Sequence, residues 1–187
     1  SMDAGVPSVA ERLAHLEPFA VEHGLAGLHH WTAERGDDEW AANWKLVITN
    51  AMESYHLFAV HPETLEPYTP TADAYYLVGH ADGTATGGAY TRGDDYVLLS
   101  LPPNFVGVVT DGAFLWQAVF PVAPDRTRVV SGGAYPSPSP SASSGVKKWA
   151  AKAAAAAAEA VVPDFLPEDK AICERGQRAA SGDFTPG

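Results

Sequence analysis

The sequence predicts an α+β domain with an antiparallel β-sheet and helices near both ends of the chain. β-branched and aromatic runs fill the middle of the 187-residue sequence, and only short turn signals separate them. Such short connections join antiparallel strands, because a parallel crossover needs about a dozen residues or more. The sequence after these runs becomes rich in alanine and other helix formers, which indicates helices at the carboxyl end.

The first part of the chain is expected to hold two short helices with a strand between them. Ser8 and Glu11 fit a capping box that begins a helix, and this helix should end before Pro18. Residues 39–48 have large apolar side chains at mostly alternating positions, which is typical of a half-buried strand. Residues 51–58 contain neither Gly nor Pro and are expected to be helical.

The middle of the chain is expected to form a meander of five or six strands. Turn signals such as Asp82-Gly83 and Asp111-Gly112 separate the runs. The runs are residues 75–78, 96–99, 105–109, 114–122 and 127–130.

Two helices are expected towards the carboxyl end. Residues 136–145 form a low-complexity loop rich in Pro and Ser, and the alanine-rich residues 146–162 favour a helix. A second helix should run from Pro167 to about Ala180, because Pro suits the first helical position and acidic residues suit the positive end of the helix dipole.

The composition excludes several classes of function. A formal net charge of −11 with only 12 Lys and Arg argues against nucleic-acid binding. The single cysteine, Cys173, cannot form an internal disulfide, a zinc ribbon or an iron–sulfur cluster, and it makes the cytoplasm the default location. We expect no membrane partner, because no run of 18 apolar residues occurs and the amino terminus does not resemble a signal peptide.

The segment from Glu53 to His61 holds a cluster of metal-type ligands. His56 and His61 are five residues apart, or about 140° around an ideal helix, so they converge only if the helix ends or distorts before the second histidine. Pro62 gives the helix a reason to end there. A histidine on a helix is usually an ordinary surface or core residue, and the spacing alone leaves that interpretation open.

Two separated motifs resemble those of one family. The first motif consists of Asn43-Trp44-Lys45, Asn50, Glu53, Tyr55-His56 and His61-Pro62-Glu63, and the second of Asp169, Ile172-Cys173-Glu174 and Gln177-Arg178. In this order they resemble the catalytic domain of Rieske non-haem iron oxygenases, which are the alpha subunits of ring-hydroxylating dioxygenases and related demethylating monooxygenases. The resemblance implies a helix-grip (START-like) domain over residues 40–187, with the antiparallel sheet packed around long carboxyl-terminal helices. Residues 1–39 would be a lead-in segment with a short helix.

The resemblance assigns His56, His61 and Asp169 as a 2-His-1-carboxylate facial triad for mononuclear Fe(II). Such a triad holds the metal on one face and leaves positions open for O2 and water. An acid at a helix amino terminus is also stabilised by the helix dipole alone, which is the ordinary alternative for Asp169. Competing carboxylates are Asp164, Glu168 and Glu174, and the position relative to Ile172-Cys173-Glu174 favours Asp169.

The resemblance also gives roles to three further residues. Glu53 matches the acid, usually Asp, that links an iron-ligand histidine to a cluster-ligand histidine of the neighbouring subunit. Glu occurs there in branches resembling quaternary-ammonium and other demethylating oxygenases, and this favours monooxygenation. Asn50 and Tyr55 would support the ligands or face the pocket, with ordinary helix packing as the alternative.

The family's amino-terminal [2Fe-2S] domain binds its cluster through Cys-x-His and Cys-x-x-His, and this sequence contains neither pattern. Together with Ser1-Met2, this predicts an excised catalytic domain that is inactive without its Rieske domain and reductase. The implied partners are O2, a small organic substrate, and a ferredoxin or reductase that passes on electrons from NAD(P)H. Family members are commonly trimers of alpha subunits, so a homotrimer is expected for the full-length protein.

The implied reaction is hydroxylation, cis-dihydroxylation or oxidative demethylation of a small aromatic or methylated-amine substrate. The substrate cavity is expected to be lined by Phe58, Phe105, Phe114, Trp116 and Tyr135. One alternative is a non-enzymatic helix-grip carrier of an apolar small molecule. A weaker alternative is a hydrolytic zinc enzyme, since the same ligands can hold zinc. Iron binding distinguishes these functions.

Overall fold

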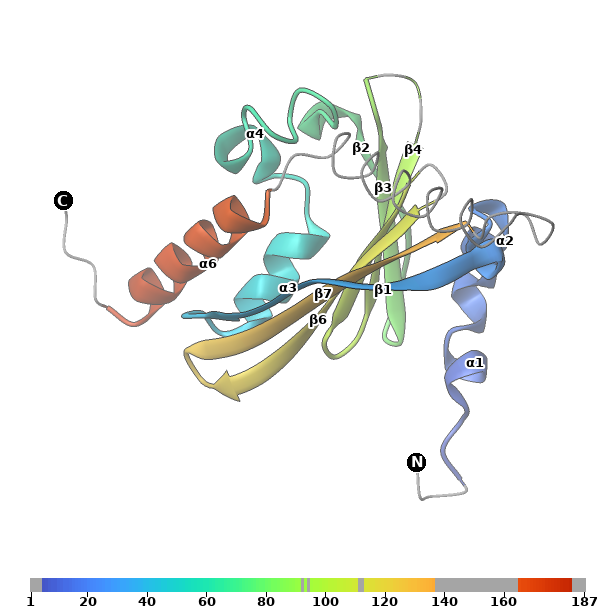
Figure 1. The fold of residues 1–187 in the computed structure, drawn as a ribbon, viewed down its shortest axis with the longest axis horizontal. Helices are drawn as coiled ribbons and strands as arrows, with labels where there is room; N and C mark the ends of the chain where they lie inside the picture. Colours follow the sequence, from blue (N-terminus) through green and yellow to red (C-terminus); the bar gives the residue numbers. More distant parts are fainter. Residues whose placement is uncertain (1–4, 92, 94, 111–112, 137–164, 183–187) are drawn as a thin grey trace.

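A computed structural model describes residues 5–182 except 92, 94, 111–112 and 137–164, with the backbone alone for 29–35, 110, 113 and 135–136. Its framework is a seven-stranded antiparallel sheet in the order β1-β7-β6-β5-β4-β3-β2 (Figure 1). The strands are β1 (Leu28–Trp40), β2 (Ala74–His80), β3 (Gly83–Ala89), β4 (Asp95–Leu101), β5 (Phe105–Thr110), β6 (Ala113–Ala123) and β7 (Arg126–Pro136). Strands β2 to β7 form a meander, and β1 joins it beside β7. The predicted α+β class with an antiparallel sheet is confirmed.

All five predicted runs form strands, and two further strands, β1 and β3, were not predicted. Strand β3 escaped prediction because its sequence, GTATGGA, lacks large side chains. The small residues leave room for rings of the neighbouring strands. A Cβ atom at Gly87 would lie 2.9 Å from the Tyr75 ring, and one at Gly88 would lie 2.7 Å from the Tyr96 hydroxyl.

The amino-terminal helices cover one face of the sheet, which we call the outer face. The predicted capping box is present at α1 (Val9–Arg12), where the backbone N–H of Ser8 donates to Glu11 Oε2 at 2.7 Å. The chain continues through short 3-10 turns and α2 (Glu17–Glu22), which places Pro18 in its first turn instead of after a helix. Leu16 packs there against Val97 and other buried apolar residues of the sheet. The 3-10 turns span Ala14–Leu16, Leu25–Gly27 and, further on, Thr71–Asp73.

The predicted strand over residues 39–48 is wrong beyond Trp40. Asn43 caps a helix, α3 (Trp44–Met52), by accepting a hydrogen bond from the Lys45 backbone N–H at 3.0 Å. Trp44, Val47 and Ile48, at helical spacing, pack against the core, and the nearly alternating pattern of the sequence concealed this period. The helix predicted over residues 51–58 is interrupted, because α3 ends at Met52 and α4 (Leu57–Val60) follows after a turn.

The predicted carboxyl-terminal helix is confirmed as α6 (Leu166–Ala180). It lies beside α3 on the other side of the sheet from α1 and α2, on what we call the inner face (Figure 1). Val47 of α3 and Cys173 of α6 meet Val119 and Val129 of the sheet in one buried cluster. The loop predicted over residues 136–145 begins at Pro136, which is the last residue of β7. The rest of that loop and the helix predicted over 146–162 lie outside the described residues. No helix in the described part of the chain is long and apolar enough to cross a membrane.

Candidate metal centre

Two short segments bring three metal-type ligands together at the amino-terminal end of α6. His56 immediately precedes α4 and His61 immediately follows it, so the helix ends before the second histidine, as the spacing requires for convergence. The two imidazole rings are 5.1 Å apart between centroids. Asp169 lies in the first turn of α6. The three side chains offer ligand atoms that all lie within 4.8 Å of one another.

The Nε2 atoms of both histidines face the same oxygen of Asp169. The distance to Asp169 Oδ1 is 3.0 Å from His61 Nε2 and 3.5 Å from His56 Nε2. The side-chain amide of Asn50 also donates to this oxygen, at 2.6 Å. Asn50 lies on α3, so three helices position the cluster and the carboxylate is held in a fixed orientation.

A second carboxylate stands behind each imidazole. His56 Nδ1 lies 2.6 Å from Glu53 Oε1, and the His56 backbone N–H donates to the other oxygen of Glu53 at 3.0 Å. His61 Nδ1 lies 2.7 Å from Glu168 Oε2, which also accepts from the Thr64 hydroxyl at 2.6 Å. An ionised carboxylate only accepts, so each Nδ1 carries the proton and each Nε2 becomes the atom available to a metal.

The charges of the cluster favour a bound cation. Burial alone would lower the pKa of His56 and His61, but their hydrogen bonds to Asp169 and the charges of Glu53, Glu168 and Asp169 outweigh it and raise both pKa values. Burial would raise the pKa of Asp169, yet the hydrogen bonds from the two imidazoles hold it below its usual range. Protons and a metal ion therefore compete for the same nitrogen atoms.

The donor set fits a metal that retains open coordination positions. Two neutral imidazoles and one carboxylate are the ligands of non-haem Fe(II) sites, and a similar set can hold Zn2+. Metal-ligating histidines usually donate their other ring N–H to a carboxylate or carbonyl, which fixes the ring and raises its basicity. Both histidines here meet that condition through Glu53 and Glu168.

A cavity of about 890 Å³ adjoins the cluster on the inner face of the sheet. On the cluster side its lining includes Asn50, Glu53, His56 and Asp169, and on the sheet side it includes Leu98, Val106, Val108, Leu115, Trp116, Gln117, Val129 and Ser131. A volume of this size accommodates a small organic molecule.

The predicted aromatic lining is wrong at three of its five positions. Trp116 lines the cavity, whereas Phe58 is exposed to solvent. Phe114 packs against the buried cluster of the outer face, because strand alternation directs it to the side opposite Leu115. Phe105 stacks on Trp116, with ring centroids 5.9 Å apart, and is not part of the lining. The side chain of Tyr135 lies outside the described part of the chain.

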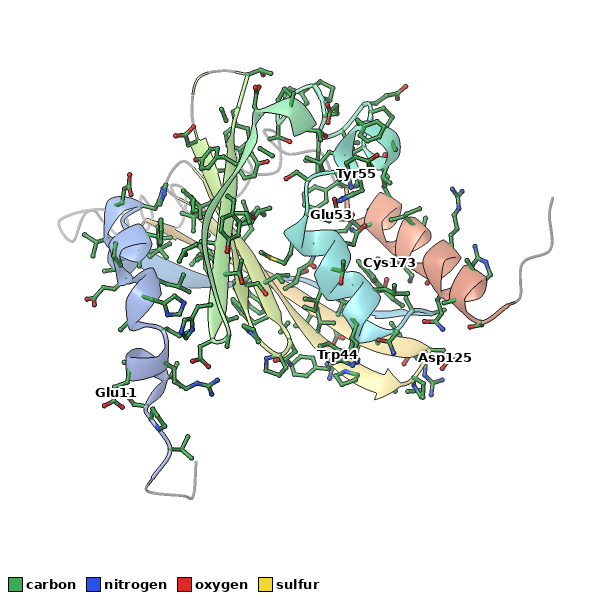
Figure 2. The ribbon with its side chains drawn as sticks, turned by 180° about the vertical axis from the view of Figure 1, so that it is seen from behind. Glu11, Trp44, Glu53, Tyr55, Asp125 and Cys173 are labelled. Carbon is green, nitrogen blue, oxygen red and sulfur yellow. The ribbon has the colours of Figure 1, made fainter. Side chains whose placement is uncertain are left out.

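The sequence-predicted site residues divide into two groups. Asn50 and Glu53 join the three proposed ligands, as Figure 2 shows for Glu53, which comes from the segment after α3. Tyr55, labelled in Figure 2, does not join them, since the residue is 74% exposed and its ring packs edge-on against Phe58.

Two functional contacts were missed by sequence reasoning. Glu168 was considered only as a competitor of Asp169, and Thr64 was not considered. The sequence signals for these two residues are slight. Glu168 is an acid adjacent to Asp169, and Thr64 is a hydroxyl residue one turn after His61.

Comparisons with known proteins agree with the fold and with the first sequence motif. Residues 22–97 match the model of the family described as the ring hydroxylating alpha subunit (catalytic domain). These residues contain the first sequence motif, with His56 and His61, so the resemblance predicted from the sequence is confirmed. A comparison with curated protein sequences finds no match.

Solved structures of two Rieske oxygenases share the fold. A quaternary ammonium Rieske monooxygenase, CntA, in complex with an inhibitor is similar with a TM-score of 0.71 and 20% identity, over 96% of this chain and 47% of that one. Naphthalene 1,2-dioxygenase from Rhodococcus sp. bound to indole is similar with a TM-score of 0.68 and 16% identity, over 98% of this chain and 52% of that one. This chain therefore spans about half the length of these relatives.

Proposed function

We propose that this chain is the mononuclear-iron catalytic domain of a Rieske-type oxygenase, with His56, His61 and Asp169 as the ligands of Fe(II). One observation carries the proposal. Each imidazole has its Nδ1 atom fixed by a carboxylate, while the Nε2 atoms of both converge with Asp169 beside a cavity. An ordinary core or surface histidine does not need this arrangement.

Fe(II), when bound, supplies the activation of O2 for hydroxylation, cis-dihydroxylation or oxidative demethylation of a small aromatic or methylated-amine substrate. The chain's own residues bind the metal and the substrate and orient them. Glu53 and Glu168 keep the Nδ1 protons in place and so keep both Nε2 lone pairs directed at the metal. Asn50 holds Asp169, and the apolar wall of the sheet excludes water from the substrate.

The electron supply is proposed to lie beyond this chain, in a [2Fe-2S] domain fed from NAD(P)H by a ferredoxin or reductase. The relatives are about twice as long as this chain, and one of them is described with inter-subunit electron transfer. Glu53 supports the same route here, because 38% of its side chain is exposed while it holds His56. Glu53 thus connects the proposed iron ligands to the surface, where the [2Fe-2S] domain of a neighbouring subunit in a homotrimer would bind.

The test is an anaerobic Fe(II) titration of the protein and of the variants His56→Ala and Asp169→Ala. The expected result is about one Fe(II) per chain, lost in both variants. Glu174→Gln is the matched control, because Glu174 lies on the same helix as Asp169 and accepts from the Ala41 backbone N–H instead of a cluster residue. Equal binding by all four proteins would refute the ligand assignment. Absence of binding would leave the cavity as that of a non-enzymatic carrier.

A further inference from the structure

Apart from the aromatic Tyr96 and Trp116, two uncharged polar side chains interrupt the apolar wall that the sheet gives to the cavity. The inner face of the sheet contributes Leu98, Val108, Leu115 and other aliphatic residues to the lining. Gln117 of β6 and Ser131 of β7 lie in the same wall and are direct cross-strand partners. Their side chains therefore stand next to each other and face the same space.

Neither polar group is used by the fold. Ser131 is only 6% exposed and lines the cavity. Within the part of the chain that the structure describes, no hydrogen bond involves its hydroxyl or the side-chain amide of Gln117. Buried polar groups in folded proteins are normally hydrogen-bonded, so a pair left open towards a cavity indicates a ligand or water as its partner.

A glycine keeps the space beside Ser131 open. Gly36 of β1 is the cross-strand partner of Ser131 at the edge of β7 that faces away from β6. A Cβ atom at Gly36 would lie 3.0 Å from Ser131 Oγ. Any larger residue would crowd the hydroxyl from this side. The corner formed by Gly36, Ser131 and Gln117 thus combines free volume with hydrogen-bonding groups.

The charged residues of the lining, in contrast, already have partners. Asp38 accepts from Lys170 Nζ at 2.7 Å, Glu53 is held by His56, and Asp169 is held by both histidines and Asn50. A negatively charged group of a substrate would find no unpaired positive charge on the described wall. Lys170 is taken up by Asp38 and the other charged groups are mostly acids, so the wall selects against anionic substrates.

We propose that Gln117 and Ser131 form a polar subsite that hydrogen-bonds an uncharged hydroxyl, carbonyl or ring N–H group of an otherwise apolar substrate. The amide and the hydroxyl each donate and accept, so the pair suits any of these groups. As an assignment of an oxygenase substrate this inference rests on the proposed function, but the binding itself does not require iron.

The experiment measures the binding of three probes by isothermal titration calorimetry. The probes are naphthalene, 2-naphthol and 2-naphthoate, which share one apolar body and differ in carrying no polar group, an uncharged one or an anionic one. We expect the protein to bind 2-naphthol about 5- to 20-fold more tightly than naphthalene, as one or two net hydrogen bonds predict, and 2-naphthoate more weakly than 2-naphthol. The double variant Gln117→Leu with Ser131→Ala should lose the preference for 2-naphthol and retain naphthalene binding.

Thr86→Val is the matched control, because Thr86 carries a buried hydroxyl without a partner among the described residues and does not line the cavity. It should leave the preference unchanged. If the double variant fails to fold by circular dichroism, Ser131→Ala alone should still reduce the preference about threefold.

Four results would overturn the proposal: no binding of any probe, tightest binding of 2-naphthoate, an unchanged preference in the folded variants, or an equal loss in the control. Fe(II) titration of the same samples separates this inference from the proposed function. Iron binding without a 2-naphthol preference removes the subsite and leaves the oxygenase. A preference for 2-naphthol without iron binding keeps the subsite and removes the oxygenase assignment.

Discussion

Glu168 should tune the metal centre through His61, although it is not itself a ligand. It accepts from His61 Nδ1 at 2.7 Å and from the Thr64 hydroxyl at 2.6 Å, and His61 is fully buried. Substitution of Glu168 by Gln keeps the shape and one acceptor but removes the charge behind the imidazole. The imidazole then becomes less basic and its orientation less fixed.

The size of the effect follows from the geometry. Loss of a carboxylate partner behind a metal-ligating histidine typically lowers metal affinity about 10- to 100-fold. The Glu168 side chain is 35% exposed, so solvent screens part of its charge and the lower end of that range applies. We therefore expect Glu168→Gln to weaken Co(II) binding about tenfold and Glu168→Ala to weaken it more.

Co(II), a spectroscopic substitute for Fe(II), allows the affinity to be read from its visible absorption bands. Thr64→Val, which removes only one support of the Glu168 carboxylate, should weaken binding by a factor of about 2 to 5. Glu174→Gln is the control on the same helix and should bind Co(II) like the unaltered protein. Wild-type affinity in Glu168→Gln, with the fold intact by circular dichroism, would refute the reasoning. An equal loss in Glu174→Gln would instead indicate a general effect on α6.

The remaining predictions concern the metal-free protein. The pKa values of His56 and His61 are raised, so the stability that these histidines contribute is complete below about pH 6.5 and is lost as the pH rises through their folded-state pKa values. The pKa of Asp169 is lowered, so its contribution to stability is present above about pH 4 and is lost on acidification. With a chelator present, the free energy of unfolding in urea should therefore fall between pH 6 and pH 8, and a rise would contradict this account. Gly87→Ala should destabilise the fold by about 1–3 kcal/mol in the same assay, because its Cβ would lie 2.7 Å from a backbone carbonyl oxygen of β4; an unchanged midpoint would show that the strand can shift. Burial and the nearby acids raise the pKa of the Cys173 thiol to about 12, so iodoacetamide should not label it at pH 8 until the protein unfolds, and rapid labelling of the folded protein would contradict its burial.

The sequence predicted elements correctly where local pattern and tertiary environment agree. Strands such as β4 and β5 are β-branched or aromatic and lie between turns, and α6 begins with Pro and acidic residues. Prediction was wrong at α3, where Trp44 and Ile48 satisfy both a strand and a helix pattern and only packing against the core decides between them. Strand β3 was missed because its residues are selected for the room they leave to Tyr75 and Tyr96.

The candidate site was likewise predictable from the sequence only in part. The spacing of His56 and His61, with Pro62 after them, indicated how they could converge, and the family resemblance supplied Asp169 as the proposed third ligand. The contacts of Glu168 with His61 and Thr64 join segments more than a hundred residues apart in sequence. A single sequence carries no signal for such a pair, because its geometry depends on how α6 docks against α4.

The docking of the helices couples the core to the candidate metal centre. On α6, Asp169 and Cys173 are one turn apart and both buried, so the helix face that completes the core also delivers the carboxylate. On α3, Val47 and Asn50 repeat this pairing, with Val47 in the core cluster and Asn50 holding Asp169 at 2.6 Å. A close-packed interior tolerates little displacement of either helix, and the position of Asp169 relative to the histidines is therefore fixed by apolar packing before any metal binds. The arrangement gives a preformed site, in which binding energy is not spent on assembling the ligands.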